Sequence, residues 1–134
     1  MITTKNVSSE YEIKSLSDVS GFLQSKKYKT AKYKDFHISL PDKKHSLRNK
    51  TMELDVEALN IRTLPTIEGT IKQIIRKNKK LIIRFRVLDH IVIKKCSNSV
   101  QNWGQVVITI KFKKDLIDNL HGWCCTDYLK EIKR

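Results

Sequence analysis

Basic residues are the most concentrated chemistry in this sequence. Between Gly69 and Lys114 the chain carries twelve lysines or arginines and a single acid, Asp89. Ammonium and guanidinium groups bind phosphates, and the counterions released from each phosphate drive the association. A cluster of this density favours a polyanion as ligand, with nucleic acid first. The twelve residues are Lys72, Arg76, Lys77, Lys79, Lys80, Arg84, Arg86, Lys94, Lys95, Lys111, Lys113 and Lys114.

Carboxylates form a second candidate site in the segment TMELDVE. Glu53, Asp55 and Glu57 alternate there with apolar residues, which predicts a half-buried strand with an acidic outer face. Clustered carboxylates can hold Mg²⁺ for phosphoryl transfer, so a metal-dependent nuclease is our third hypothesis. Carboxylates two residues apart on a wet strand face are commonly just solvated, and we expect no enzyme.

Histidines and cysteines give no recognisable metal or catalytic motif. A structural zinc site needs four nitrogen or sulfur ligands, and the sequence has no C-x₂₋₄-C pair. It also lacks a G-x-S-x-G motif, a phosphate-binding glycine loop and a dinucleotide fingerprint. We therefore predict neither metal nor cofactor, interpret the two adjacent cysteines as partly buried apolar residues, and leave open a Cys–His pair that meets in space. The residues in question are His90, Cys96, His121, Cys124 and Cys125.

Cysteine usage and hydropathy indicate the compartment. Three cysteines, an odd number, are a poor disulfide framework and favour a reducing environment. The segment MITTKNVSSEYEIK lacks the apolar core of a signal peptide, and no run approaches the roughly 18 apolar residues of a membrane span. We expect a cytoplasmic protein, or a nuclear one in a eukaryote, with no membrane partner.

A two-residue period dominates the middle of the chain and predicts the strands that position the basic residues. Two of these strands, joined by the basic segment 77–80, predict a hairpin. The predicted strands are 51–57, 66–76, 81–89, 90–95 and 105–112.

The remaining segments predict little further structure. Residues 1–14 are polar and unpatterned, which predicts a flexible lead-in. Apolar residues at helical spacing predict a short helix over 17–26, and one or two short helices from Lys114 to the end. The length fits one basic domain over 15–134, with a β-rich core at about 50–113.

These elements predict an α+β fold: a small five-stranded, mostly antiparallel barrel or bent sheet with a short N-terminal helix and a C-terminal helical segment. A five-stranded barrel with an electropositive sheet and basic loops resembles the oligonucleotide-binding fold, or OB-fold, over about residues 50–113. The resemblance implies binding of single-stranded DNA or RNA. It identifies no individual binding residue.

Strand alternation divides the predicted sheet into an apolar face and a cationic face. Ile83 and Phe85 fall on the apolar face. Like charges on neighbouring strands destabilise a sheet unless something compensates them, which favours a bound anion over a merely solvated face. Part of the charge is structural if the acids of 51–57 lie across from it. The predicted cationic face includes Lys72, Arg84, Arg86, Lys94 and Lys111.

Aromatic side chains are the usual platforms for the bases of a single strand, each worth about 1–3 kcal/mol per base. Alternation places Phe85 and Phe112 on the core side, so we expect Trp103, with Tyr28 or Tyr33, to provide the platforms. The tyrosines suit equally well a role in anchoring the helix to the core.

The sequence thus predicts a non-catalytic nucleic-acid-binding protein, for instance a DNA replication accessory. Binding is expected to be largely independent of base sequence, because phosphate contacts position a strand without specifying its bases. Single-stranded DNA is favoured over RNA. The main alternative is a protein-interaction subunit of a polymerase, helicase or ribonucleoprotein complex, whose basic face meets an acidic partner. The predicted binding residues are Lys72, Arg76, Lys77, Lys79, Lys80, Arg84, Arg86, Lys94, Lys111, Lys113, Trp103, Tyr28 and Tyr33.

Overall fold

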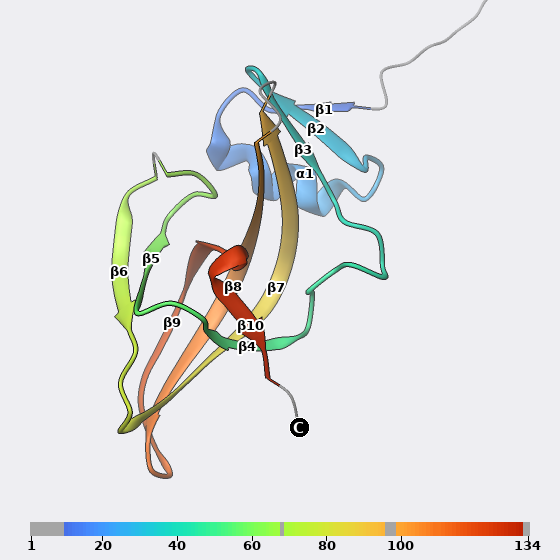
Figure 1. The fold of residues 1–134 in the computed structure, drawn as a ribbon. Helices are drawn as coiled ribbons and strands as arrows, with labels where there is room; N and C mark the ends of the chain where they lie inside the picture. Colours follow the sequence, from blue (N-terminus) through green and yellow to red (C-terminus); the bar gives the residue numbers. More distant parts are fainter. Residues whose placement is uncertain (1–9, 68, 96–98, 133–134) are drawn as a thin grey trace, which may run out of the picture.

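The computed structural model describes residues 10–67, 69–95 and 99–132, which form one mixed sheet (Figure 1). Within these residues ten strands pair in the order β1-β2-β3-β7-β8-β9-β5-β6, while β4 pairs with both β7 and β10. The elements are β1 (Glu10–Glu12), η1 (Leu16–Asp18), α1 (Val19–Ser25), β2 (Thr30–Tyr33), β3 (Phe36–Ser39), β4 (Thr51–Leu54), β5 (Ala58–Arg62), β6 (Ile71–Arg76), β7 (Leu81–Lys95), β8 (Val100–Phe112), β9 (Asp115–Cys125), η2 (Thr126–Tyr128) and β10 (Leu129–Glu131).

Three long antiparallel strands, β7, β8 and β9, form a ribbon along the molecule (Figure 1). A two-residue turn, Lys113 and Lys114, joins β8 to β9, and Lys113 adopts a positive φ of 56°. The predicted hairpin of 66–76 with 81–89 is wrong, because β6 pairs with β5 while β7 pairs with β8. The predicted strands at 81–89 and 90–95 are one continuous strand, β7.

A β-bulge at Leu88 allows β7 to contribute to two cores. Val87 and Asp89 face consecutive residues of β8, so Leu88 between them has no partner. Because side chains alternate along a strand, one unpaired residue sends all later side chains to the other face. Val87 therefore packs in one hydrophobic cluster, and Ile91 packs in another on the opposite face of the sheet.

The two clusters divide the molecule into halves. The first lies between the ribbon and strands β4, β5, β6 and β10, and the second lies between the ribbon and the N-terminal elements. Helix α1, predicted over 17–26, is confirmed at Val19–Ser25 and buries two residues in the second cluster. The first cluster contains Met52, Leu54, Leu59, Ile61, Ile75, Ile83, Phe85, Val87, Val106, Ile108, Cys124 and Leu129. The second contains Ile13, Leu16, Val19, Phe22, Ala31, Ile38, Ile91, Ile93, Trp103 and Trp123.

Part of the predicted flexible lead-in is folded. Glu10–Glu12 form β1, which pairs in parallel with β2, and Ile13 is buried in the second cluster. Residues 1–9 lie outside the described residues. The lysine-rich segment that follows α1 forms the hairpin of β2 and β3, and β3 continues the sheet to β7.

The predicted five-stranded α+β barrel with a C-terminal helical segment is wrong. The structure is mostly strand, and its sheet is open and mixed. The tail forms β9, η2 and β10 instead of one or two helices. Leu116, Ile117 and Leu120 have helical spacing in the sequence, but all three lie in β9. Ile117 is a second bulge residue, without a partner on β8. No helix in the described part of the chain is both long and apolar enough to cross a membrane.

Candidate nucleic-acid interface

The outer face of the ribbon, opposite the first cluster, carries three cations. Arg84 and Arg86 alternate with first-cluster residues along β7, and Lys111 lies past the first cluster on the same face of β8. The guanidinium group of half-buried Arg84 donates to the main-chain oxygen of Ile83 at 3.2 Å, which leaves most of its donors free. None of the residues across the β7–β8 ladder from these cations is acidic. They are Thr109, Val107 and Ile82.

Two basic connections meet at the end of this face. One joins β6 to β7 and the other is the β8–β9 turn, and the pairing of Leu81 with Phe112 brings them together at the lower end of the ribbon in Figure 1. The side chain of Asn78 accepts a hydrogen bond from the main-chain N–H of Lys80 at 2.9 Å and so fixes the first connection. We call the following eight cations the basic end: Lys77, Lys79, Lys80, Arg84, Arg86, Lys111, Lys113 and Lys114.

The basic end lacks carboxylate partners. Asp115 and Asp118 lie on the adjoining strand β9, the main-chain oxygen of Glu57 accepts from the N–H of Lys77, and Glu53 lies two residues along β4 from Thr51, the partner of Arg86. Four acids against eight cations still leave about half of the positive charge uncompensated. The resulting positive potential attracts anions. The ion pairs found among the described residues all lie elsewhere: His37 with Glu10, His45 with Asp42, Lys50 with Glu131, and Lys130 with Asp55.

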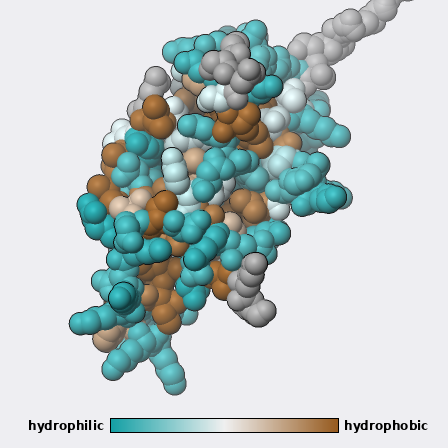
Figure 2. Space-filling model, in the orientation of Figure 1, coloured by the Kyte–Doolittle hydropathy of each residue, from teal (hydrophilic) through white to brown (hydrophobic). Residues whose placement is uncertain are grey.

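Phe112 supplies the basic end with an aromatic ring that the sequence analysis placed in the core. The residue is 41% exposed, and the ammonium group of Lys113 lies 5.5 Å from its ring centroid. The expectation fails because the ribbon extends past the first cluster, so inward-facing side chains at its tip reach solvent. Figure 2 shows hydrophilic side chains at this lower end with hydrophobic ones gathered behind them. The other exposed apolar residues of the ribbon's end are Ile82, Leu116 and Ile117.

Three predicted phosphate ligands are not part of the basic end. Lys72 donates from Nζ to the main-chain oxygen of His121 at 2.8 Å. Arg76 ends the edge strand β6, just before the first basic connection. Lys94 follows the Leu88 bulge, so it lies on the opposite sheet face from Arg84. The single cationic face that alternation predicts is therefore divided between the two sides of the sheet.

The predicted stacking residues are placed around the second cluster. Trp103 is 2% exposed and its indole N–H donates to Gln101 at 3.1 Å, so it offers no ring face to a base. The ring of Tyr28 meets the ring of Tyr11 edge-on at 5.4 Å, an anchoring contact. Trp103 also borders a cavity beside β5, and Tyr33, discussed below, lines another.

The predicted acidic strand does not gather its carboxylates. β4 ends at Leu54, so Asp55 and Glu57 fall in the bend before β5 and only Glu53 remains in a strand. Asp55 lies 4.0 Å from the ammonium group of Lys130. Among the described residues no group of three His, Cys, Asp or Glu side chains is arranged to hold a metal ion. The nuclease hypothesis therefore gains no site from this structure.

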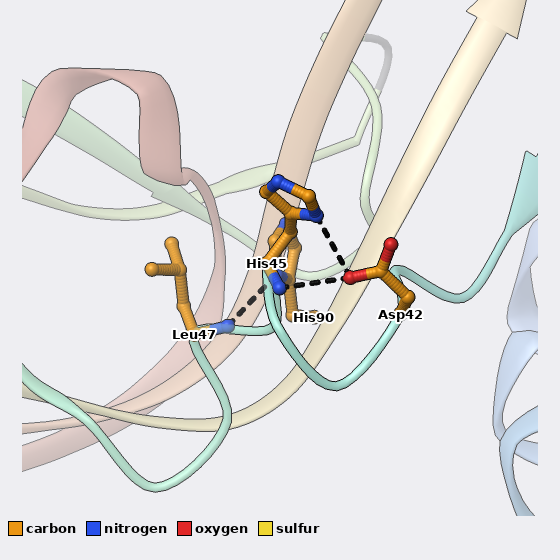
Figure 3. Close-up of polar contacts among 4 residues, drawn as sticks. All are labelled: Asp42, His45, Leu47 and His90. Carbon is orange, nitrogen blue, oxygen red and sulfur yellow. Dashed lines mark hydrogen bonds and ion pairs between the residues drawn. The ribbon is translucent and has the colours of Figure 1, made fainter.

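His90 is occupied by a hydrogen-bond network. Its Nδ1 accepts from the main-chain N–H of Leu47 at 3.1 Å (Figure 3), so its Nε2 carries the proton and donates to Asn102 at 2.9 Å. The amide of Asn102 donates in turn to Asp127 at 2.9 Å. This chain of bonds connects the β3–β4 loop to η2 across the ribbon, and it leaves neither ring nitrogen of His90 for a metal.

The loop that His90 holds is also fixed by Asp42. One carboxylate oxygen of Asp42 accepts from the main-chain N–H of His45 at 2.9 Å, and Nδ1 of the same residue lies 2.8 Å from it (Figure 3). These hydrogen bonds lower the pKa of the Asp42 carboxyl. The contact is local to the loop.

The adjacent cysteines are confirmed as buried or half-buried residues. Cys124 belongs to the first cluster, and burial, followed by the neighbouring Cys125, raises its pKa to about 12. Burial raises the pKa of Cys125 to about 11. Neutral thiols are poor nucleophiles and poor metal ligands, so neither residue indicates a catalytic or metal site. Cys96 lies outside the described residues.

Comparisons with known proteins add no family to this geometry, since no family model, curated protein or solved structure matches the chain.

Proposed function

We propose that this chain is a non-catalytic binding protein for single-stranded nucleic acid, with the basic end as its contact surface. The observation that carries the proposal is a group of eight cations on neighbouring strands and turns with no ion-paired carboxylate among the described residues. Like charges so arranged repel one another, and phosphates relieve that repulsion while releasing their counterions.

The shape and chemistry of the basic end favour a single strand over a duplex. Phe112 is exposed among lysines, and a ring in a cationic surface can stack on an unpaired base. Lysines contact phosphates as point charges and distinguish no base, so the binding is largely independent of sequence. We favour single-stranded DNA over RNA as the ligand, and the experiment below compares the two.

Fluorescence anisotropy with labelled single-stranded DNA, duplex DNA and RNA over a salt series tests the proposal. If about five phosphates are engaged, the logarithm of the affinity for a single strand falls with the logarithm of salt at a slope of about −3 to −4. A slope near zero, or equal affinity for an uncharged backbone analogue, would show that phosphates are not the ligand.

A pair of charge reversals localises the contact. K79E/K80E removes two exposed lysines of the basic end and should weaken single-strand binding by about tenfold or more at low salt. K43E/K44E is the matched control, because those two lysines are also adjacent and exposed but lie in the β3–β4 loop. Equal losses in both variants would indicate a general effect of net charge instead of a defined surface.

Exposed apolar residues beside the basic end support a second candidate function, an interaction subunit that binds an acidic protein partner. Ile82, Leu116 and Ile117 provide the hydrophobic area that a protein interface needs and a phosphate backbone does not. Under this alternative, L116S/I117S abolishes assembly with the partner, and the isolated chain binds oligonucleotides only weakly from the start. Under the proposal above, that variant keeps its affinity for oligonucleotides.

A further inference from the structure

A cavity of about 250 Å³ lies at the opposite end of the ribbon from the basic end. It opens between the β2–β3 hairpin, the ends of β7 and β8, and the segment that follows β5. Its apolar lining includes Leu16, Ile38 and Ile93, while Ser99 and Gln101 supply hydrogen-bonding groups. Pockets for drug-sized ligands span about 300–1,000 Å³, so this one suits a smaller ligand, such as a single planar ring system.

Two aromatic rings form one wall of the cavity. Tyr33 and Phe36 are paired directly across the β2–β3 hairpin, which places their rings together at 6.3 Å between centroids and 15° between planes. Each ring has a lysine ammonium group over it, Lys34 at 5.2 Å from Tyr33 and Lys95 at 5.6 Å from Phe36. Both lysines are exposed. The wall therefore combines two ring surfaces with one lining cation, Lys95, and a second cation, Lys34, in the β2–β3 turn beside it.

This combination matches a nucleobase with its attached phosphates. Stacking of a base on an aromatic ring is worth more than a cation–π contact at an exposed site, so a base displaces a solvated lysine from the ring. The displaced ammonium group then meets a phosphate on either side of the base. Ser99 and Gln101 line the same cavity and offer hydrogen-bonding groups for the polar edge of a base, although the amide oxygen of Gln101 already accepts from Trp103.

We propose that this cavity binds one base of the single strand held at the basic end, stacked against Tyr33 or Phe36, with Lys34 and Lys95 on the flanking phosphates. The inference rests on the proposed function. Strand register places Lys95 on the same face of the sheet as Arg86, nine residues along β7. At about 3.3 Å per residue the two contacts are roughly 30 Å apart, so only a strand of several nucleotides reaches both.

Binding to an oligothymidylate of about 20 nucleotides, longer than the usual 4–16 nucleotide sites, tests the inference. Y33L keeps the apolar bulk but removes the ring, and it should lower the affinity about tenfold; Y33F should restore wild-type binding. Y28L is the matched control, since Tyr28 is another half-buried tyrosine of the second cluster. On a matched abasic strand, Y33L and wild type should bind equally, because no base remains to stack.

Each outcome decides the two proposals separately. Failure of the wild-type protein to bind any strand contradicts the proposed function itself, and the inference with it. If the wild type binds but neither Y33L nor F36L weakens binding of the thymidylate, only the base-binding cavity is rejected. Free thymidine monophosphate competing at the cavity, with strand binding insensitive to Y33L, would reject the strand as its source. A 5-iodouracil cross-link to Tyr33 or Phe36, mapped by mass spectrometry, would support the assignment directly.

Discussion

At the scale of single residues, His90, Cys124 and Cys125 have structural surroundings and not those of a reactive site. Both ring nitrogens of His90 form hydrogen bonds, and burial raises the pKa of Cys124 and of Cys125, which favours the neutral thiols. The chemistry that remains accessible includes the cations of the basic end, exposed Phe112 and the half-buried Tyr33–Phe36 pair. Our proposal that the chain binds an anion rests on these residues.

The thiol of Cys124 should make the protein less stable at alkaline pH. Its pKa rises from 9.0 to about 12 in the folded protein, so above pH 9 it ionises only after unfolding. The unfolded state therefore binds fewer protons, and the free energy of unfolding should fall by about 1 kcal/mol between pH 9 and pH 10. Cys125 adds less, because it is half exposed and solvent screens its charge.

Urea denaturation at pH 8, 9 and 10 measures this effect. C124A lacks the titrating thiol, so its unfolding free energy should fall less steeply than that of the wild type over the same range. The other side chains of the protein are present in both variants, so their contributions cancel in the comparison. Parallel pH dependences would show that Cys124 ionises as readily in the folded state as in the unfolded one.

At the scale of elements, the contact between β5 and β9 depends on Gly122. Among the described residues, the pairing of Arg62 with Trp123 is the one backbone pairing between these two strands. A Cβ on Gly122 would lie 2.6 Å from a methyl group of buried Ile61 and 3.0 Å from the main-chain oxygen of Arg62. The backbone of β5 must move to admit it, and G122A should cost about 1–3 kcal/mol of stability.

The matched variant is G21A in helix α1. Its new Cβ would meet only the hydroxyl end of Tyr11, at 2.7 Å, and a flexible side chain can move aside. Replacing a helical glycine by alanine gains roughly 0.5–1 kcal/mol, so G21A should be neutral or stabilising. Urea denaturation of both variants gives the comparison. Equal destabilisation would mean that close approach to β5 is not what Gly122 provides.

Strand positions were predictable from the sequence only in the middle of the chain, where β4, β6, β7 and β8 lie, and strand partners were not predictable. Alternation correctly indicates that Ile83 and Phe85 lie inward while Arg84 and Arg86 lie outward, because that pattern is local. The bulges at Leu88 and Ile117 carry no turn residue or other signal, since they are imposed by pairing with β8. The Leu88 bulge places Lys94 on the opposite face from Arg84, and the Ile117 bulge interrupts strand alternation in β9, which was predicted as a helix.

The candidate site also has features that were predictable from the local sequence and features that depend on strand pairing. The lysine-rich connection 77–80 was predictable as a loop, whereas its meeting with the β8–β9 turn required the pairing of Leu81 with Phe112. The exposure of Phe112 depends on how far the ribbon extends past the first cluster, which no local pattern records. Trp103 is the reverse case, because the same ribbon buries it in the second cluster.

At the scale of the whole molecule, a formal net charge of +13 on 134 residues lowers the stability of the fold and favours the binding of anions. Self-repulsion weakens the folded state, and it is strongest where the basic end brings eight cations onto adjoining strands and turns. Salt screens charges over about 10 Å at 0.1 M. The same screening that relieves the repulsion also weakens binding to phosphates, so the two properties respond to salt in opposite directions.

K79E/K80E should separate these two properties, because the lysines proposed to bind phosphates are also those that repel one another. At low salt the variant should be more stable than the wild type by about 0.5 kcal/mol, in the range of surface charge effects, while it binds single strands more weakly. K43E/K44E should gain no stability, since those lysines lie outside the basic end and the neighbouring Asp42 would repel the new glutamates. Urea denaturation in low and high salt measures the difference, and the gain of K79E/K80E should vanish as salt screens the repulsion. If K79E/K80E proves less stable than the wild type at low salt, then Asp115 and Asp118 already balance the basic end, and the uncompensated charge on which the proposed function rests does not exist.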